Sequence, residues 1–270
     1  SGEFNTAIGT NALYTSNGYG NTAIGNATLF ENETGNYNTA AGMWSMYENI
    51  NGNYNTAHGV SAGDWRTNIT YGTFVGADAY ASANSLTNVA GYGYNARPTA
   101  SNQVRIGNSS VSSIGGWAGW TNLWDSRYSR NIEDDVVGLE FITKLRPVTY
   151  QLDVHGLANE LDEDCRRDAD GNSYIDTPGI KDQQGRSEKS TIRYSGFVAE
   201  EVERAARESG FDFSGVDVPK NDSDFYGLRY AEFVVPLVKA VQEQQEIIDR
   251  QQRQIDELLH RIMILESRGN

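Results

Sequence analysis

The first 107 residues repeat one short pattern of small, polar and apolar residues. Asn-Thr-Ala-Ile-Gly at residues 5–9 recurs at residues 21–25, and looser copies of it follow. The copies end at Gly9, Gly25, Gly42, Gly59, Gly76, Gly91 and Gly107. The steps between these glycines are 16, 17, 17, 17, 15 and 16 residues, which leaves room for about two short strands and two turns per repeat. Because one such repeat cannot bury its own apolar face, the repeats must stack, and the pattern predicts a β-solenoid.

Alternation within each repeat sends Ala to one side of the strand and Thr and Ile to the other. We expect the small Ala to fill a narrow interior, Gly to permit the turn that follows, and aligned Asn side chains to form hydrogen-bond ladders. The outward aliphatic residues are expected to bring chains together: Ile8, Ile24, Val75 and Ile106. The alternative is a disordered Asn/Gly-rich tract, which has no reason to hold a phase.

The last 37 residues carry the strongest periodic signal, in which two heptad positions are apolar over five heptads. One position holds Val234, Val241, Ile248, Ile255 and Ile262, and the other holds Leu237, Gln244, Gln251, Leu258 and Leu265. This repeat predicts a coiled coil, in which the two Gln layers set register and strand number and the β-branched residues suit two or three strands. The alternative is a helix that packs on its own domain, chiefly in its first two turns around Pro236.

Between the repeats and the heptads we predict a small mixed α/β region. Apolar residues three apart form a stripe over residues 133–145, where acids open a helix and Arg146-Pro147 ends it. We predict strands at residues 147–152 and 192–198, a helix at 199–209 stopped by a glycine, a short extended piece at 226–230, and an inserted surface loop at 155–190.

Composition indicates where the domains meet and argues against nucleic acid, a membrane span and a Cys-based metal site. The chain has 270 residues, 22 basic and 36 acidic, and its net charge of −14 argues against nucleic acid. No apolar run is long enough to span a membrane, and one cysteine with three scattered histidines offers no disulfide or Cys-based metal site. Lysine is absent before residue 123. We therefore predict a cloning remnant at residues 1–4, a shaft at 5–122, a second domain at 123–230 and a coiled-coil helix at 231–270.

The repeats over residues 5–107 resemble the head repeats of trimeric autotransporter adhesins, which share an Asn-Ser-Val-Ala-Ile-Gly-type motif. That resemblance implies a left-handed parallel β-roll in a bundle of three chains. A trimeric shaft upstream makes three strands the simplest choice for the coiled coil.

The second half contains three ordered blocks, within residues 125–150, 194–202 and 226–245. In this order they resemble the C-terminal intramolecular chaperone of phage endosialidase tailspikes and related tail fibres, over about residues 121–266. The resemblance implies a domain that joins three chains, lets an upstream β-shaft fold in register and then cuts itself off. In that family a serine attacks the peptide bond before it, and a lysine five residues on is the general base.

This chain departs from the family at both catalytic positions. Aligned on Ile132, the serine position holds Trp124 and the lysine position holds Ser129. The retained motif residues are Asp125, Arg127, Asn131 and Ile132. We therefore expect the chaperone fold without self-cleavage, and a still-active serine autoprotease that uses other residues is the alternative. We find no residue set for an outside substrate and expect no cofactor.

A weak calcium motif lies in the predicted loop. Its oxygen ligands alternate at Asp168, Asp170, Asn172 and Asp176, as Ca²⁺ requires. Gly stands at the fourth place rather than the sixth, and Gly179 takes the place of the bidentate Glu. We favour a solvated acidic turn and predict no metal.

Aromatic residues crowd the shaft, among them Trp44 and Trp65, and three more tryptophans (Trp117, Trp120 and Trp124) follow it. On a narrow fibre such side chains could bind a glycan or a cell-surface receptor, but packing is the interpretation we favour. The sequence thus predicts a homotrimeric extracellular fibre, on a cell surface or a virion or tail-like particle, whose C-terminal part drives assembly.

Overall fold

The computed structural model describes residues 2–122, 125–167 and 172–269. The chain forms two compact units that interleave in sequence. One unit contains Ser1–Ala118, Gln151–Tyr194 and Pro219–Asp224, and the other contains Gly119–Tyr150, Ser195–Val218 and Phe225–Asn270. The domains predicted from composition are consecutive segments, whereas these units exchange segments along the chain.

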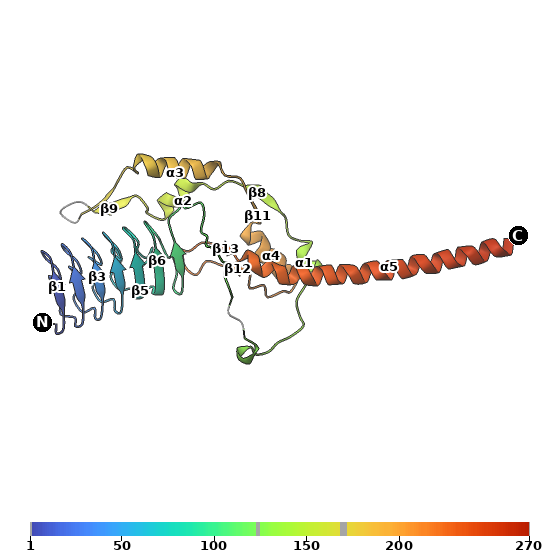
Figure 1. The fold of residues 1–270 in the computed structure, drawn as a ribbon, viewed down its shortest axis with the longest axis horizontal. Helices are drawn as coiled ribbons and strands as arrows, with labels where there is room; N and C mark the ends of the chain where they lie inside the picture. The colour runs from blue at the N-terminus through green and yellow to red at the C-terminus, as the bar shows by residue number, and fades with distance from the viewer. Residues whose placement is uncertain (1, 123–124, 168–171, 270) are drawn as a thin grey trace. The chain divides into compact units, whose positions relative to one another are not determined.

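A parallel β-solenoid forms most of the first unit and confirms the fold predicted from the repeats (Figure 1). Its sheet runs in sequence order through β1 (Thr6–Ile8), β2 (Thr22–Ile24), β3 (Thr39–Ala41), β4 (Thr56–His58), β5 (Thr70–Val75), β6 (Thr87–Tyr92) and β7 (Val104–Ile106). Corresponding residues of successive repeats pair directly, as in Thr6 with Thr22 and Thr22 with Thr39. The repeat length therefore sets the register of the sheet.

The interior of the solenoid is narrow and filled by small side chains, as the alternation predicts. Ala23, Ala40 and Ala57 are almost completely buried, and Leu29 and Met46 pack in the same core. On β5 the alanine is replaced by Phe74, and a Cβ on the nearby Gly63 would lie only 3.2 Å from that ring. The missing side chain at Gly63 makes room for the phenyl ring in this close-packed interior.

A glycine follows each of the short strands because the chain turns there with a backbone that L-residues avoid. Gly25, Gly42 and Gly59 have φ of 134°, 138° and 136°. A Cβ on Gly42 would also overlap the carbonyl oxygen of Gly59 in the next coil. Both facts explain the glycine that closes these copies. In the sixth copy the predicted closing residue, Gly91, is wrong: it lies within β6 opposite Phe74, and Gly93, with φ 105°, takes the turn.

Residues 151–167 and 172–194 form a structured insert against the solenoid, so the predicted surface loop is wrong. The insert contains α2 (Val154–Glu160), β9 (Cys165–Arg167), β10 (Ser173–Ile175) and α3 (Ile180–Thr191), and it runs alongside the coils (Figure 1). Its buried side chains include Glu163 and Arg186, which are 0% and 4% exposed. Because charged groups form part of its buried face, hydrophobic periodicity could not reveal it.

The second unit is a small α+β assembly that ends in a long helix. Its elements are a 3₁₀ turn (Ser126–Tyr128), α1 (Leu139–Ile142), β8 (Val148–Tyr150), β11 (Tyr194–Gly196), α4 (Ala199–Glu208), β12 (Val216–Asp217), β13 (Gly227–Leu228), a second 3₁₀ turn (Tyr230–Phe233) and α5 (Val234–Gly269). β8 pairs with β11, and β12 pairs with β13. The predicted strands and the helix at 199–209 are confirmed with shorter bounds. Among the described helices, none is both long and apolar enough to cross a membrane.

The helix predicted over residues 133–145 is confined to α1, and its first half is wrong. The carboxylate of Glu243 on α5 accepts a hydrogen bond from the Leu139 backbone nitrogen at 2.7 Å, which satisfies the N-terminus of α1. Phe141 is the buried residue of α1 and packs with Val202 and Phe233 in the core of this unit. The start of this helix thus depends on a contact 104 residues away, which a local pattern cannot predict.

Candidate assembly site

Helix α5 presents a continuous apolar stripe to solvent. The eight apolar residues at the two heptad positions are 45–67% exposed: Val234, Leu237, Val241, Ile248, Ile255, Leu258, Ile262 and Leu265. Gln244 and Gln251 lie on the same stripe and are also exposed. The predicted long helix is confirmed, and the stripe has the composition of a coiled-coil seam.

The first turns of α5 pack on their own unit through a different face. Pro236 and Ala240 are buried there, and Glu243 caps α1. Val234 and Val241 stay exposed in the same turns. Packing around Pro236 therefore leaves the heptad stripe exposed, and the coiled coil stays a prediction for that face.

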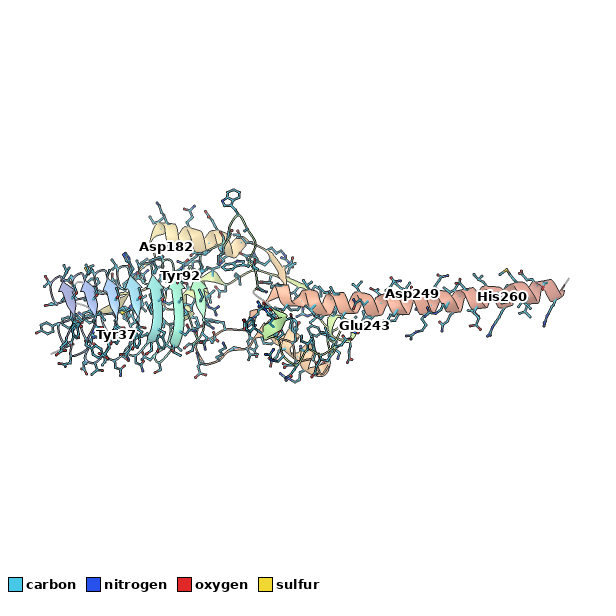
Figure 2. The ribbon with its side chains drawn as sticks, turned by 60° about the horizontal axis from the view of Figure 1, so that its bottom comes forward. Tyr37, Tyr92, Asp182, Glu243, Asp249 and His260 are labelled. Atoms are coloured by element: carbon cyan, nitrogen blue, oxygen red, sulfur yellow. The ribbon has the colours of Figure 1, made fainter. Side chains whose placement is uncertain are left out.

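The polar groups beside the stripe find partners within the helix. Gln245 donates to Asp249 at 2.7 Å and Gln252 donates to Asp256 at 2.8 Å, each one turn on. Figure 2 shows α5 with Glu243, Asp249 and His260 labelled along it. Such i,i+4 pairs stabilise an exposed helix surface. Exposure of the apolar stripe to water is unfavourable by comparison.

A second exposed apolar column follows the outer face of the solenoid sheet. Register pairing aligns Ile8, Ile24, Ala41, His58, Val75, Tyr92 and Ile106. Its large apolar members are 41–59% exposed, and His58 is exposed in the place that Ile occupies in other coils. Parallel sheets are normally covered on both faces, so this column is a candidate surface for chain association.

The shaft aromatics stack on one another from coil to coil. The rings of Tyr37, Tyr54 and Tyr71 have centroids 5.1 and 5.4 Å apart, and Tyr19 meets Tyr37 edge-on at 4.8 Å. A second row stacks Phe30 between Tyr14 and Tyr47. The 17-residue spacing of Tyr37, Tyr54 and Tyr71 was the sequence signal for this ladder.

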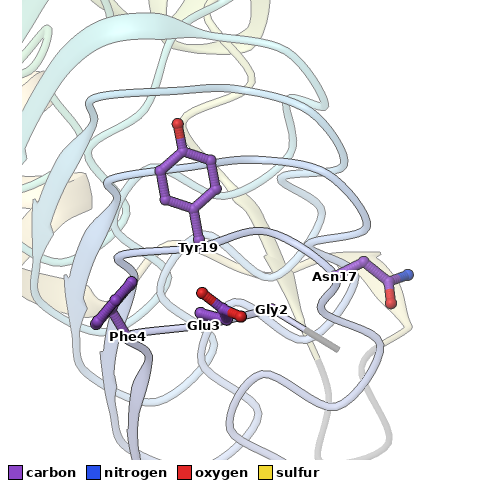
Figure 3. Close-up of a pocket in the computed structure, with 5 residues that line it drawn as sticks. All are labelled: Gly2, Glu3, Phe4, Asn17 and Tyr19. Atoms are coloured by element: carbon purple, nitrogen blue, oxygen red, sulfur yellow. The ribbon is translucent and has the colours of Figure 1, made fainter.

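An open pocket lies at the first coil, with Gly2, Glu3, Phe4, Asn17 and Tyr19 around it (Figure 3). Glu3 is the carboxylate of this lining and Tyr19 its phenol, so the pocket has no nucleophile–base pair. The geometry therefore supports no catalytic role for this pocket.

Of the family's catalytic positions, Trp124 lies outside the described residues. Asp125 and Arg127 form an exposed ion pair at 2.6 Å, and the Asp125 carboxylate also accepts from the Arg127 nitrogen at 2.9 Å. These hydrogen bonds from Arg127 lower the pKa of Asp125. The Ser129 hydroxyl donates to the Asp125 carbonyl at 3.3 Å, Asn131 has a φ of 51°, and Ile132 is 73% exposed. Asp125 thus caps the 3₁₀ turn that contains Arg127.

The calcium motif is described only in its second half. Asp168 and Asp170 lie outside the described residues. Asn172 is exposed, and the backbone nitrogen of Asp176 donates to the carbonyl of Asp164 at 2.8 Å. Within the part of the chain that the structure describes, no three His, Cys, Asp or Glu side chains gather as a metal site would require.

Sequence reasoning missed a buried cluster of charged residues where the insert meets the solenoid, which includes Glu163, Arg186 and Arg97. Those residues are spread over 90 positions and carry no motif, so their proximity is visible only in the fold. Comparisons of the chain with protein-family models, with curated proteins and with solved structures found no match.

Proposed function

We propose that the chain is part of a homotrimeric fibre whose C-terminal region joins three copies and lets the solenoid shaft fold in register. The observation that carries this proposal is the exposed apolar stripe of α5. A helix of 36 residues is about 54 Å long, far more than its own unit covers. Most of that stripe needs a partner of the same length, and a second and third copy of α5 supply it.

The solenoid gives independent support. Its outer column of aliphatic and aromatic residues has the period of the coils, so an identical column on another chain matches it along its whole length. The two surfaces lie on the two ends of the sequence, and both favour self-association. We propose that this fibre is extracellular and lies on a cell surface or on a virion or tail-like particle.

The resemblance to trimeric fibre chaperones favours three strands, and the heptad residues are compatible with two or three. β-Branched residues fill one heptad position, and Gln244 and Gln251 place two polar layers in the seam. Polar layers penalise misaligned helices, so they suit a domain that must fix the register of three shafts.

We further propose that the chain remains uncut. Trp124 has no nucleophilic group, and Ser129, in the place of the family's lysine, cannot act as a base. Intact mass after long incubation tests this point. A fragment that begins at or near Trp124 would show that the autoprotease is active through other residues.

Light scattering at micromolar concentration tests the trimer. We expect about three times the chain mass of 29.8 kDa. A monomer would refute the proposed function. A chain truncated after Arg229 tests the chaperone role separately, because we expect it to assemble slowly or not at all. If the truncated chain forms the same trimer at the same rate, the C-terminal helix has no role in assembly.

A receptor- or glycan-binding shaft is the second candidate, and the aromatic ladders give it less support. A sugar stacks on a free ring face, but both faces of Tyr54 are taken by Tyr37 and Tyr71. The ring centroids of Trp65 and Tyr80 are 6.0 Å apart, and Trp44 is half-buried. A glycan-array signal that vanishes on replacing Trp44 or Trp65 would favour this candidate.

A further inference from the structure

The chain between the solenoid and the second unit is an exposed connector. Residues 112–122 contain no helix or strand, and every one of them is exposed. Trp117 and Trp120 are among the most exposed residues described, at 107% and 88%. Exposed irregular backbone of this kind is where proteases cut.

Residues beyond this connector return to the solenoid and bind it through buried charges. Glu163 is fully buried and accepts hydrogen bonds from the Ser109 backbone nitrogen at 2.7 Å and from its hydroxyl at 2.6 Å. Arg186 of α3 pairs with Asp164 at 2.7 Å and with Glu163 at 3.4 Å. The insert therefore brings its own counter-charge to the carboxylate that binds Ser109.

Further hydrogen bonds close the same contact from both sides. Lys189 of α3 donates to the carbonyls of Ser109 and Val111, each at 2.7 Å. From the solenoid, Asn95 donates to the Glu163 carbonyl at 2.6 Å and Arg97 donates to the carbonyl of Leu161 at 3.2 Å.

A second, shorter segment also binds the solenoid. Asp224 has a side chain that is 3% exposed and accepts from the Thr99 hydroxyl at 2.6 Å and from Gln103 at 2.9 Å. Asn221 donates to the Thr99 carbonyl at 3.0 Å. Both segments lie after the connector in sequence and belong to the compact unit of the solenoid.

We propose that residues 151–194 and 219–224 form a non-covalent latch that keeps the C-terminal half of the chain on the shaft when the connector is cut. Separating the latch would break the hydrogen bonds that Glu163 and Lys189 make with residues 109–111 and those that Asp224 makes with Thr99 and Gln103. Hydrogen bonds to charged groups are each worth about 1.5–3 kcal/mol. The latch keeps the C-terminal half of the chain bound to the solenoid whether or not the connector backbone is continuous. It acts within one chain, so it does not depend on the proposed trimer.

The experiment uses the full chain with a site-specific protease sequence inserted after Gly116. After complete cutting, confirmed on a denaturing gel, size-exclusion chromatography is run in rising urea. We expect the cut wild type to elute as one particle in buffer. Arg186→Met, which leaves Glu163 and Asp164 without their cation, should release the two halves at a lower urea concentration. Lys189→Gln should do so to a smaller extent.

Lys181→Gln is the matched control, because it removes the same charge from an exposed position of α3. Its halves should separate at the wild-type urea concentration. Separation of the cut wild type in buffer would overturn the latch, and so would equal behaviour of Lys189→Gln and Lys181→Gln. Circular dichroism of the uncut variants tests whether each is folded. If Arg186→Met does not fold, the comparison of Lys189→Gln with Lys181→Gln tests the latch by itself. A monomeric chain that passes this test would refute the trimer and leave the latch intact.

Discussion

The side-chain oxygen of Asn38 accepts a hydrogen bond from the Asn55 backbone nitrogen at 3.0 Å, one coil further along the solenoid. Its side-chain nitrogen donates to the Gly52 carbonyl at 2.8 Å. The same bond joins Asn21 to Asn38 at 2.9 Å, and Asn55 to Gly72 at 2.7 Å. The asparagines of the first four repeats thus satisfy peptide groups of the next coil, which confirms the predicted ladder.

Asn38→Ala should therefore destabilise the solenoid by about 3 kcal/mol, since it leaves two buried peptide groups without partners. Urea unfolding followed by circular dichroism measures the loss. Asn53→Ala is the control: Asn53 accepts from the Asn36 nitrogen at 2.9 Å, but it is half-exposed and water can replace it. Equal losses for the two variants would show that burial of the ladder is irrelevant.

Gly42→Ala should be more harmful than any surface substitution. At φ 138° an alanine is strained, and its Cβ would overlap the next coil, so we expect a loss above about 3 kcal/mol. Gly210→Ala provides the comparison, because Gly210 has φ 63° with open space around its Cα and should lose only about 1 kcal/mol. Thermal unfolding of both variants measures the combined cost of the clash and of the strained φ at Gly42. Similar melting temperatures would contradict the close approach of the coils.

The solenoid could be predicted from sequence because its contacts repeat. The first six coils meet at offsets of 16 or 17 residues and the last pair at 14, so Ala, Asn and Gly recur almost in phase with their structural role. The heptad repeat of α5 could be predicted from the sequence for the same reason. Local periodicity is sufficient wherever a residue's neighbours are set by a constant step along the chain.

The insert and the start of α1 could not be predicted because their contacts are single and distant. Glu163 meets Ser109 at a separation of 54 residues, and Glu243 meets Leu139 at 104. Neither pair repeats along the chain. The glutamates in both pairs are charged, so the pattern of hydrophobic residues does not reveal these contacts. Only the three-dimensional fold reveals which charges neutralise one another.

Replacing a residue of the α5 stripe tests the seam directly. Ile255→Asp should reduce the proposed trimer to monomers at micromolar concentration, since three carboxylates in an apolar layer cost several kcal/mol. Arg253→Ala is the control on the same turn, away from the stripe. Molar mass by light scattering gives the answer, and an unchanged trimer in Ile255→Asp would remove α5 from the interface.

A substitution in a polar layer of the proposed seam should stabilise the assembly instead of breaking it. Gln251→Leu should raise the melting temperature, because a leucine buries apolar surface where the glutamine needs a hydrogen-bond partner. It should also weaken the choice of strand number, so mixed oligomers are expected beside the trimer. A lower melting temperature with an unchanged oligomer would mean that Gln251 makes a favourable contact outside the seam.

The carboxylate of Asp78 lies 3.6 Å from the guanidinium of Arg166 and gives the stability of the chain a dependence on pH. Burial raises the pKa of Asp78 above 3.8, and the charges of Arg166 and Arg97 only partly oppose this. The folded chain therefore binds this proton more tightly than the unfolded chain does. The stability that Asp78 contributes is fully present below pH 3.8 and is lost as the pH rises through its folded pKa, by about 1.4 kcal/mol for each tenfold difference in proton affinity.

Asp78→Asn isolates this contribution, because asparagine does not titrate and every other group is shared. The measured quantity is the free energy of unfolding of the wild type minus that of Asp78→Asn, at several pH values between 4 and 7. We expect this difference to fall as the pH rises, which is opposite to the behaviour of a carboxylate stabilised by an ion pair. If the difference grows instead, attraction by Arg166 and Arg97 outweighs burial, and the Asp78 carboxylate is held by its ion pairs.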